Sequence, residues 1–115
     1  MRRIFPLFAL LLVGCMFHGE TKYEAAEVKA EALLVYGKTW SARNEKKLED
    51  IDVLAQYAED GEQAIFDPWN QQFQFSYVIE PETQKERLVI WTTEPKSGRV
   101  IAAPRQLASL VDPSK

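Results

Sequence analysis

The sequence predicts an α+β fold in which a long N-terminal helix and a short helix pack on a three-stranded antiparallel β-meander. Residues 21–59 are rich in Ala, Glu, Leu and Lys, and their apolar positions recur every three or four residues, which is a helical period. Residues 64–103 change to alternating apolar and polar positions, with Pro- and Gly-containing turns between short runs. Short links of this kind favour antiparallel neighbours.

The first predicted element is a long helix over residues 21–43. Thr21 and Glu24 have capping-box spacing, in which the two side chains satisfy free backbone amides at a helix start. Two adjoining apolar stripes follow, and together they predict a wide face that lies against the sheet. The stripes consist of Ala25, Val28, Ala32, Val35 and Thr39, and of Ala26, Leu33, Tyr36 and Trp40.

A second, shorter helix is predicted over residues 45–59. Its apolar face contains Leu48, Ile51, Leu54 and Ala58, and its acidic residues point away. Gly61 is able to adopt the left-handed conformation that ends a helix.

Three strands are predicted to follow, at residues 72–79, 88–93 and 99–103. In the first strand Phe73, Phe75, Tyr77 and Ile79 alternate with more polar positions, as in a half-buried strand. The segments 80–86 and 94–98 carry Pro or Gly where turns need them. A short helix is predicted over residues 105–111, and we find no internal repeat.

The N-terminus has the features of an export signal. Arg2 and Arg3 precede an apolar run at residues 4–13, and this run is shorter than the roughly 20 residues that span a membrane. The run leads to Gly14-Cys15, which resembles the bacterial lipobox, where a signal peptidase cuts ahead of a lipidated cysteine. The resemblance implies a mature chain that begins at Cys15, with palmitate-like acyl chains on its sulfur and amino group.

These features divide the chain into four parts. We expect a lipoprotein signal peptide at residues 1–14, a lipidated tether at 15–20, one domain at 21–111 and a frayed tail at 112–115. A mature chain of about 100 residues can bury one modest core. Cys15 is the only cysteine, which excludes a disulfide within the chain.

Charge excludes some classes of partner. The formal net charge is −3, and loss of Arg2 and Arg3 makes it two units more negative. An acidic domain is a poor ligand for nucleic acid or for anionic lipid. Membrane contact is therefore expected through the lipid on Cys15. Met16 follows where an aspartate would indicate inner-membrane retention, so the outer membrane is favoured within the cell envelope, with the domain facing the periplasm or exterior.

The sequence offers no catalytic or metal-binding constellation, so we expect no enzyme, no cofactor and no metal. His18 is the only histidine and lies in the predicted tether, which leaves the serines without a base and a zinc site without nitrogen ligands. A calcium site from Glu80, Glu82 and Glu86 is an alternative, but Lys85 and Arg87 interleave these carboxylates and favour a solvated loop.

A rigid corner is predicted between the second helix and the first strand. Pro68 has the fixed φ that suits the second position of a type I turn, and Asp67 can accept hydrogen bonds from the amides that follow. Asn70 occupies a position that tolerates the left-handed region. We expect Trp69 to lie over the sheet edge and lock the turn.

Residues 67–75 resemble the Asp-Pro-Trp-Gly-x-Pro-Tyr-x-Tyr signature in the C-terminal domain of the type II secretion major pseudopilin, protein G. The first three residues match, and Phe73 and Phe75 stand at the tyrosine positions. Asn70 replaces the glycine and Gln72 replaces the second proline. The order of a long helix, a short helix, this corner and a small antiparallel sheet is also similar. The resemblance implies that residues 21–103 adopt this fold.

The chain departs from that family in two respects. A lipobox stands where a pseudopilin carries its filament-forming helix, and residues 20–43 are too polar to replace that helix. The acidic, glycine-rich calcium loop of the family has no clear counterpart here. The resemblance therefore implies the fold and not the filament.

The leading hypothesis is a lipid-anchored envelope protein whose domain is a non-catalytic interaction or scaffold module. Its protein partner would lie in the cell envelope, and secretion or pilus-like components are candidates by analogy. The alternative is a small periplasmic ligand binder or sensor in which sheet aromatics line a pocket. The aromatics at residues 40, 73, 75, 77 and 91 favour a core over a ligand platform, whereas exposed Tyr or Trp among them would indicate a binding patch.

Overall fold

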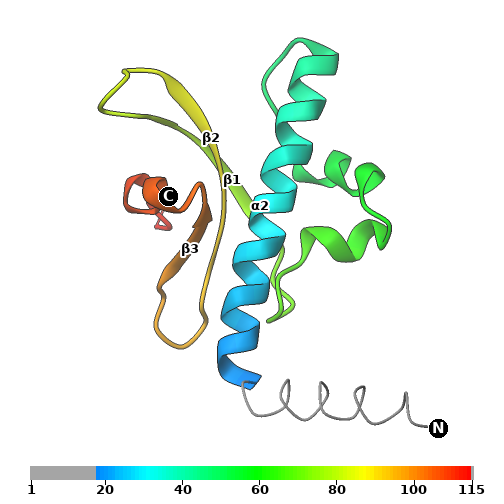
Figure 1. Ribbon diagram of the computed structural model, residues 1–115, viewed down its shortest axis with the longest axis vertical. Coiled ribbons are helices and arrows are strands. Elements are labelled where there is room, and N and C mark those ends of the chain that lie inside the picture. The colour runs from blue at the N-terminus through cyan, green and yellow to red at the C-terminus, as the bar shows by residue number, and fades with distance from the viewer. Residues whose placement is uncertain (1–17, 115) are drawn as a thin grey trace, which may run out of the picture.

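The computed structural model describes residues 18–114 and confirms an α+β fold with a long helix, short helices and a three-stranded antiparallel sheet. The predicted signal peptide and Cys15 lie outside the described residues. Figure 1 shows the long helix α2 beside the sheet, with the chain from β3 to the C-terminus on the far side of the sheet from α2.

Helix α2 spans His18–Asn44, so Thr21 lies inside the helix and the predicted capping-box start is wrong. A Thr-x-x-Glu spacing equally fits two residues one turn apart within a continuous helix. The helix ends where Glu45 adopts a φ of 52° and the Lys46 amide donates to the Ser41 carbonyl. This is a Schellman ending with glutamate at the usual glycine position.

Only one of the two predicted apolar stripes of α2 faces the sheet. Ala26 and Leu33 are at most 1% exposed, whereas Val28 and Val35 are 66% and 60% exposed. The prediction that both stripes are buried is therefore wrong. The contact with the sheet is close, because a Cβ at Gly37 would come within 2.8 Å of Leu88 Cδ2.

The predicted second helix is wrong in type and extent. The segment contains one 3₁₀ helix, η1 at Ile51–Tyr57, and a second, η2 at Gly61–Ile65, follows it. Leu48, Ile51 and Leu54 are buried at a spacing of three, which matches the period of a 3₁₀ helix. Lys29 of α2 holds η2 in place by donating to two backbone carbonyls, those of Gln63 at 3.2 Å and Phe66 at 2.9 Å.

The sheet is the predicted meander, with β1 at Gln74–Ile79, β2 at Glu86–Thr93 and β3 at Val100–Ala103. The strands lie in the order β1-β2-β3 and pair antiparallel throughout. Phe75 lies opposite Ile90, which fixes the register between the first two strands.

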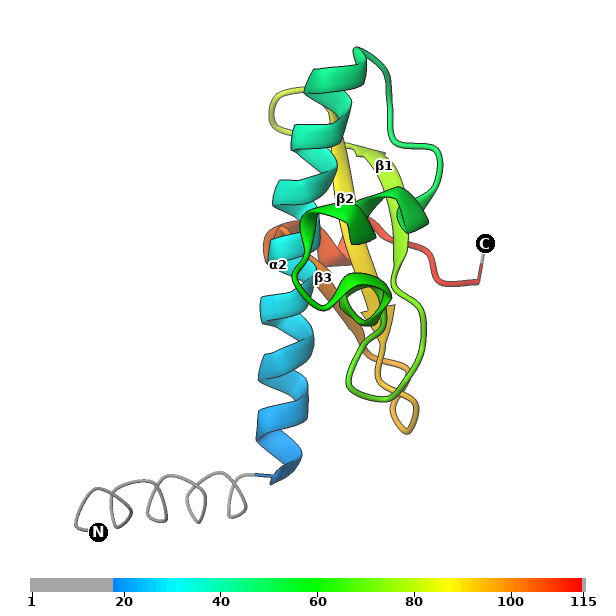
Figure 2. The ribbon, with the colours of Figure 1, turned by 90° about the vertical axis from the view of Figure 1, so that its right-hand side faces the viewer.

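Both faces of the sheet are covered. On one face α2 and η1 close a core formed by Ala30, Leu33, Leu48, Ile51, Leu54, Ile65, Phe73, Leu88, Ile90 and Ala103. On the other face the 3₁₀ helix η3, at Arg105–Leu110, closes a smaller cluster formed by Val89, Ala102, Leu107 and Val111. The short C-terminal helix predicted over 105–111 is thus of the 3₁₀ type. Figure 2 shows α2 at one edge of the molecule, with the sheet, η1 and η2 to one side of it and η3 behind it.

The two hairpin turns are built alike and share a six-residue pattern. Residues 80–85 read Glu-Pro-Glu-Thr-Gln-Lys and residues 94–99 read Glu-Pro-Lys-Ser-Gly-Arg. In each turn the glutamate amide donates to the carbonyl of the last residue and the fifth residue donates back to the glutamate carbonyl. Gln84 and Gly98, the fifth residues, have φ values of 60° and 73°.

Candidate interaction surface

The corner predicted at residue 67 is organised around a buried carboxylate. Asp67 is 4% exposed, and its Oδ1 accepts hydrogen bonds from the amides of Trp69 at 2.9 Å and Gln71 at 2.8 Å. Asn70 has a φ of 64°, as its position requires, and its amide donates to the Asp67 carbonyl at 2.9 Å. The predicted roles of Asp67 and Asn70 are thus confirmed.

The second carboxylate oxygen ties the corner to the end of β2. Asp67 Oδ2 accepts from Gln71 Nε2 at 2.8 Å and from Thr92 Oγ1 at 2.5 Å. Gln71 Nε2 also donates to the Thr93 carbonyl at 2.8 Å. With four donors the carboxylate has filled its ordinary capacity. Asp67 therefore holds the fold together and has no free acceptor for a ligand.

Trp69 is partly buried and belongs to neither core cluster, and its predicted place over the sheet edge stays a prediction. Pro68 is likewise partly buried. Phe73, by contrast, is 1% exposed, and Phe75 packs against the core under α2.

Sequence reasoning missed Gln71 and Thr92. Gln71 is an unspecified position of the nine-residue signature, and Thr92 lies 25 residues from Asp67 along the chain. No local pattern signals such a bond. The one clue is that a buried strand such as β2 must satisfy any hydroxyl that it carries.

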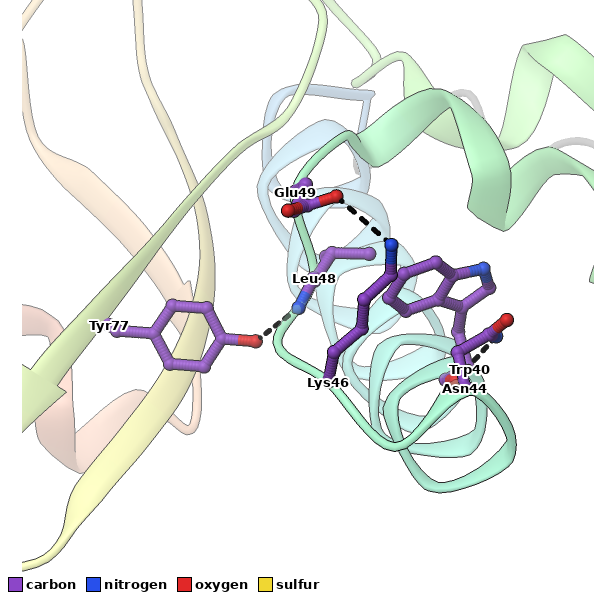
Figure 3. Close-up of polar contacts among 6 residues, drawn as sticks. All are labelled: Trp40, Asn44, Lys46, Leu48, Glu49 and Tyr77. Carbon is purple, nitrogen blue, oxygen red and sulfur yellow. Dashed lines mark hydrogen bonds and ion pairs between the residues drawn. The ribbon is translucent and has the colours of Figure 1, made fainter.

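The aromatic residues of the sheet belong to the core. Tyr77 packs under α2, and its Oη accepts from the Leu48 amide at 2.7 Å (Figure 3). Trp91 lies on the opposite face, where its Nε1 donates to Ser76 Oγ at 3.0 Å. Neither ring lines any of four grooves that indent the described surface. Both polar tips are thus satisfied within the chain.

A third aromatic residue, Trp40, lies near the C-terminal end of α2. Lys46 Nζ is 5.6 Å from the centre of the Trp40 ring and 3.4 Å from Glu49 Oε1, as Figure 3 shows. Asn44 Nδ2 donates to the Trp40 carbonyl at 2.8 Å. These contacts brace the end of the helix and involve exposed charges, which contribute little energy.

The carboxylates considered for calcium are engaged by the chain itself. Glu80 Oε1 accepts from Thr83 Oγ1 at 2.8 Å and forms an ion pair with Arg87 at 3.1 Å, and Glu86 forms an ion pair with Lys47. The Thr83 bond is the main cause that lowers the pKa of Glu80, opposed by partial desolvation and reinforced by Arg87. Within residues 18–114 no three His, Cys, Asp or Glu side chains converge as metal ligands.

The two most exposed large apolar side chains of the described residues, Val28 and Val35, lie on α2, ahead of Ile79 on β1 and Leu110 on η3. We define the outer stripe as the residues of α2 that follow each other at alternating spacings of three and four on its solvent side, namely Ala25, Val28, Ala32, Val35, Thr39 and Ala42. Its two valines are among the few large apolar side chains that the described residues expose. In Figure 2 α2 runs along one edge of the molecule, away from η1 and η2.

Two grooves run along the flanks of the outer stripe. A groove of about 470 Å³ contains Val28 and Ala32 and is walled by Tyr36 and Tyr57, whose rings stack at 5.8 Å. A groove of about 520 Å³ on the other flank contains Val35 and is walled by residues of β3 and η3. A ridge between two grooves is a shape that accepts a packed helix.

Within residues 18–114 no helix is both long enough and apolar enough to span a bilayer. Comparison with protein-family models, with curated proteins and with solved structures finds no match to this chain. On the described surface, the outer stripe of α2 is the candidate that gathers the two most exposed large apolar side chains on one face.

Proposed function

We propose that the protein is a lipid-anchored envelope lipoprotein whose single α+β domain is a non-catalytic interaction module. The observation that carries the interaction role is the outer stripe, because Val28 and Val35 are 66% and 60% exposed on a helix flanked by grooves. Apolar side chains gathered on one face mark an interaction site more often than scattered ones do.

The polar groups of the domain support a non-catalytic role. Asp67 accepts four internal hydrogen bonds, and Glu80 and Glu86 form internal ion pairs. Among the described residues no buried polar side-chain atom lacks a hydrogen-bond partner. The polar side chains named above are committed to holding the fold, which leaves the apolar helix face for recognition.

The lipid anchor is supported by the N-terminal sequence. Arg2, Arg3, the apolar run 4–13 and Gly14-Cys15 follow in the order that a bacterial lipoprotein signal requires. Acylation at both the sulfur and the amino group would hold the protein stably, since one chain alone binds marginally. Because α2 begins only a few residues after Cys15, the anchor would hold the domain close to the membrane by the N-terminal end of α2.

The resemblance of residues 67–75 to the major pseudopilin of type II secretion supports a role beside secretion or pilus-like assemblies. The polar character of α2 favours an accessory and not a filament subunit, since its solvent side carries Glu24, Glu31 and Lys38. The alternative of a ligand binder with sheet aromatics in a pocket has no support in the positions of Tyr77 and Trp91.

The anchor is tested by Cys15→Ser in the full chain, expressed in a bacterium. The wild type should sediment with membranes and incorporate an alkyne-labelled palmitate, and Cys15→Ser should do neither. Met16→Ser is the matched control, because it changes the neighbouring residue and leaves the thiol in place. Membrane association of Cys15→Ser equal to that of the wild type would refute the lipoprotein assignment.

A further inference from the structure

We infer that the outer stripe of α2 binds the same stripe of a second copy, with the two helices antiparallel. This inference deepens the interaction role proposed above, on which it rests, by naming the partner. It depends on the spacing, size and charge of residues on the solvent side of α2.

The outer stripe has the spacing of a coiled-coil seam. From Ala25 to Ala42 its members alternate spacings of three and four residues, which is the heptad pattern that keeps one face of a helix against a partner. Side chains of this size permit close approach. Thr39 fits such a seam because its Oγ1 already donates to the Val35 carbonyl at 2.9 Å, so no donor would be buried unpaired.

The flanking charges select the orientation. Glu31 and Lys38 lie on the same side of the stripe, seven residues apart, and both are exposed. Neither forms an ion pair within the described chain. In an antiparallel pair, each Glu31 would face the partner copy's Lys38. A parallel pair would set Lys38 against Arg43 of the second copy, which is repulsive.

The same charges, together with the overlap of the two stripes, select the register. When Ala32 packs against Val35 of the second copy, Val28 meets Thr39 and Ala25 meets Ala42, so a larger side chain faces a smaller one in the central layers. Both Glu31–Lys38 pairs form in this register. A slide of one heptad in one direction sets Glu31 against Glu31 and Glu24 against Lys38, and it leaves Thr39 and Ala42 with no residue of the outer stripe opposite them. A slide in the other direction sets Lys38 against Lys38 and leaves Ala25 and Val28 unopposed in the same way.

On the opposite flank of the outer stripe, no like charges face each other near the centre of the pair in this register. Lys29, which lies on that flank, is committed to the carbonyls of Gln63 and Phe66 and does not project a free charge toward the seam. The like charges Lys22 and Arg43 would approach each other only at the two ends, where water screens them.

Charge reversal tests the interface in the full chain. The protein is purified in a mild detergent, and its molar mass is measured by sedimentation equilibrium. The wild type should be a dimer, and Glu31→Lys or Lys38→Glu alone should weaken it about tenfold by turning two attractive pairs into repulsive ones. The double variant Glu31→Lys/Lys38→Glu should restore the dimer. Glu82→Lys, an exposed change in the first hairpin turn, is the control and should have no effect.

Disulfide formation tests the orientation. In the antiparallel pair, Val28→Cys chains mixed with Thr39→Cys chains should cross-link to each other, while Val28→Cys chains alone should not, because their Cα atoms lie about 16 Å apart along the seam. The wild type serves as the control for bonding through Cys15. Cross-linking of Val28→Cys to itself would indicate a parallel pair and overturn the inference.

The two proposals fail in different ways. A monomeric wild type, or a dimer insensitive to the charge reversals, would overturn the α2 interface while the dependence of membrane association on Cys15 stood. A dimer that responds to the charge reversals, from a chain whose membrane association ignores Cys15→Ser, would support the interface and remove the lipid anchor alone.

Discussion

Asp67 shows how one side chain can close a loop over a sheet. It is 4% exposed, and its carboxylate is bonded both to its own turn and to Thr92 on β2. A hydrogen bond to a charged acceptor is worth more than a neutral one, and loss of a donor leaves a buried acceptor undersatisfied.

We predict that Thr92→Val lowers the free energy of unfolding by about 2 kcal/mol, because it removes the hydroxyl that donates to Asp67 Oδ2 and keeps the shape of the side chain. Urea denaturation measures the change. Thr93→Val is the control, since only the backbone carbonyl of Thr93 contacts the corner, and it should cost less than about 0.5 kcal/mol. Equal effects of both variants would contradict this role of Thr92.

Glu80 gives the fold a dependence on pH. Its pKa is lowered in the folded protein, chiefly by the Thr83 hydrogen bond, so its stabilising contribution is present above the unfolded pKa of about 4.3 and is lost as pH falls through the lower folded value. Glu80→Gln should therefore flatten the fall in stability between pH 5 and the folded pKa, measured by urea denaturation at a series of pH values. Glu82→Gln, an exposed neighbour, should leave the slope as it is in the wild type.

At the scale of elements, the two hairpin turns use one design with different residues at the left-handed position. Gln84 has a φ of 60° where Gly98 has a φ of 73°. A side chain at this conformation is strained, and a Cβ at Gly98 would meet nothing within 4 Å, so backbone strain alone sets the difference.

A reciprocal exchange tests this design. Gly98→Gln should destabilise the domain by about 1 kcal/mol, and Gln84→Gly should stabilise it by about 0.5 kcal/mol, because glycine enters the left-handed region without steric cost. Thermal unfolding of both variants measures the two shifts. Changes of the same sign would mean that contacts of the side chains outweigh the backbone term.

The elements also show what sequence can and cannot predict. The meander follows from alternation at residues 73–79 and from turn residues, and both signals are local. The 3₁₀ type of η1 cannot be predicted from such local signals, because a spacing of three suits both a 3₁₀ helix and one face of an α-helix. The bond from Asp67 to Thr92 joins distant segments, so it is visible only in the folded chain.

For the whole molecule, the main difference between prediction and structure is that only one of the two apolar stripes of α2 meets the sheet. Val28 and Val35 are as apolar as the buried residues, and periodicity reports that a stripe exists without reporting what covers it. Two apolar stripes on one helix are expected when the helix packs twice, once on its own sheet and once on a partner. The sequence thus contained the candidate surface, but only the structure separated it from the core.

The order of the layers has a consequence for synthesis of the chain. α2 emerges first from the ribosome, but Leu33 packs in a cluster that includes Ile90 and Ala103, which are made some 60 to 70 residues later. Its inner face is covered in stages, first by residues 48–65, then by β2 and last by β3. The core of this small protein is therefore completed late, and a chain cut short before β3 would leave exposed the part of α2 that β3 covers.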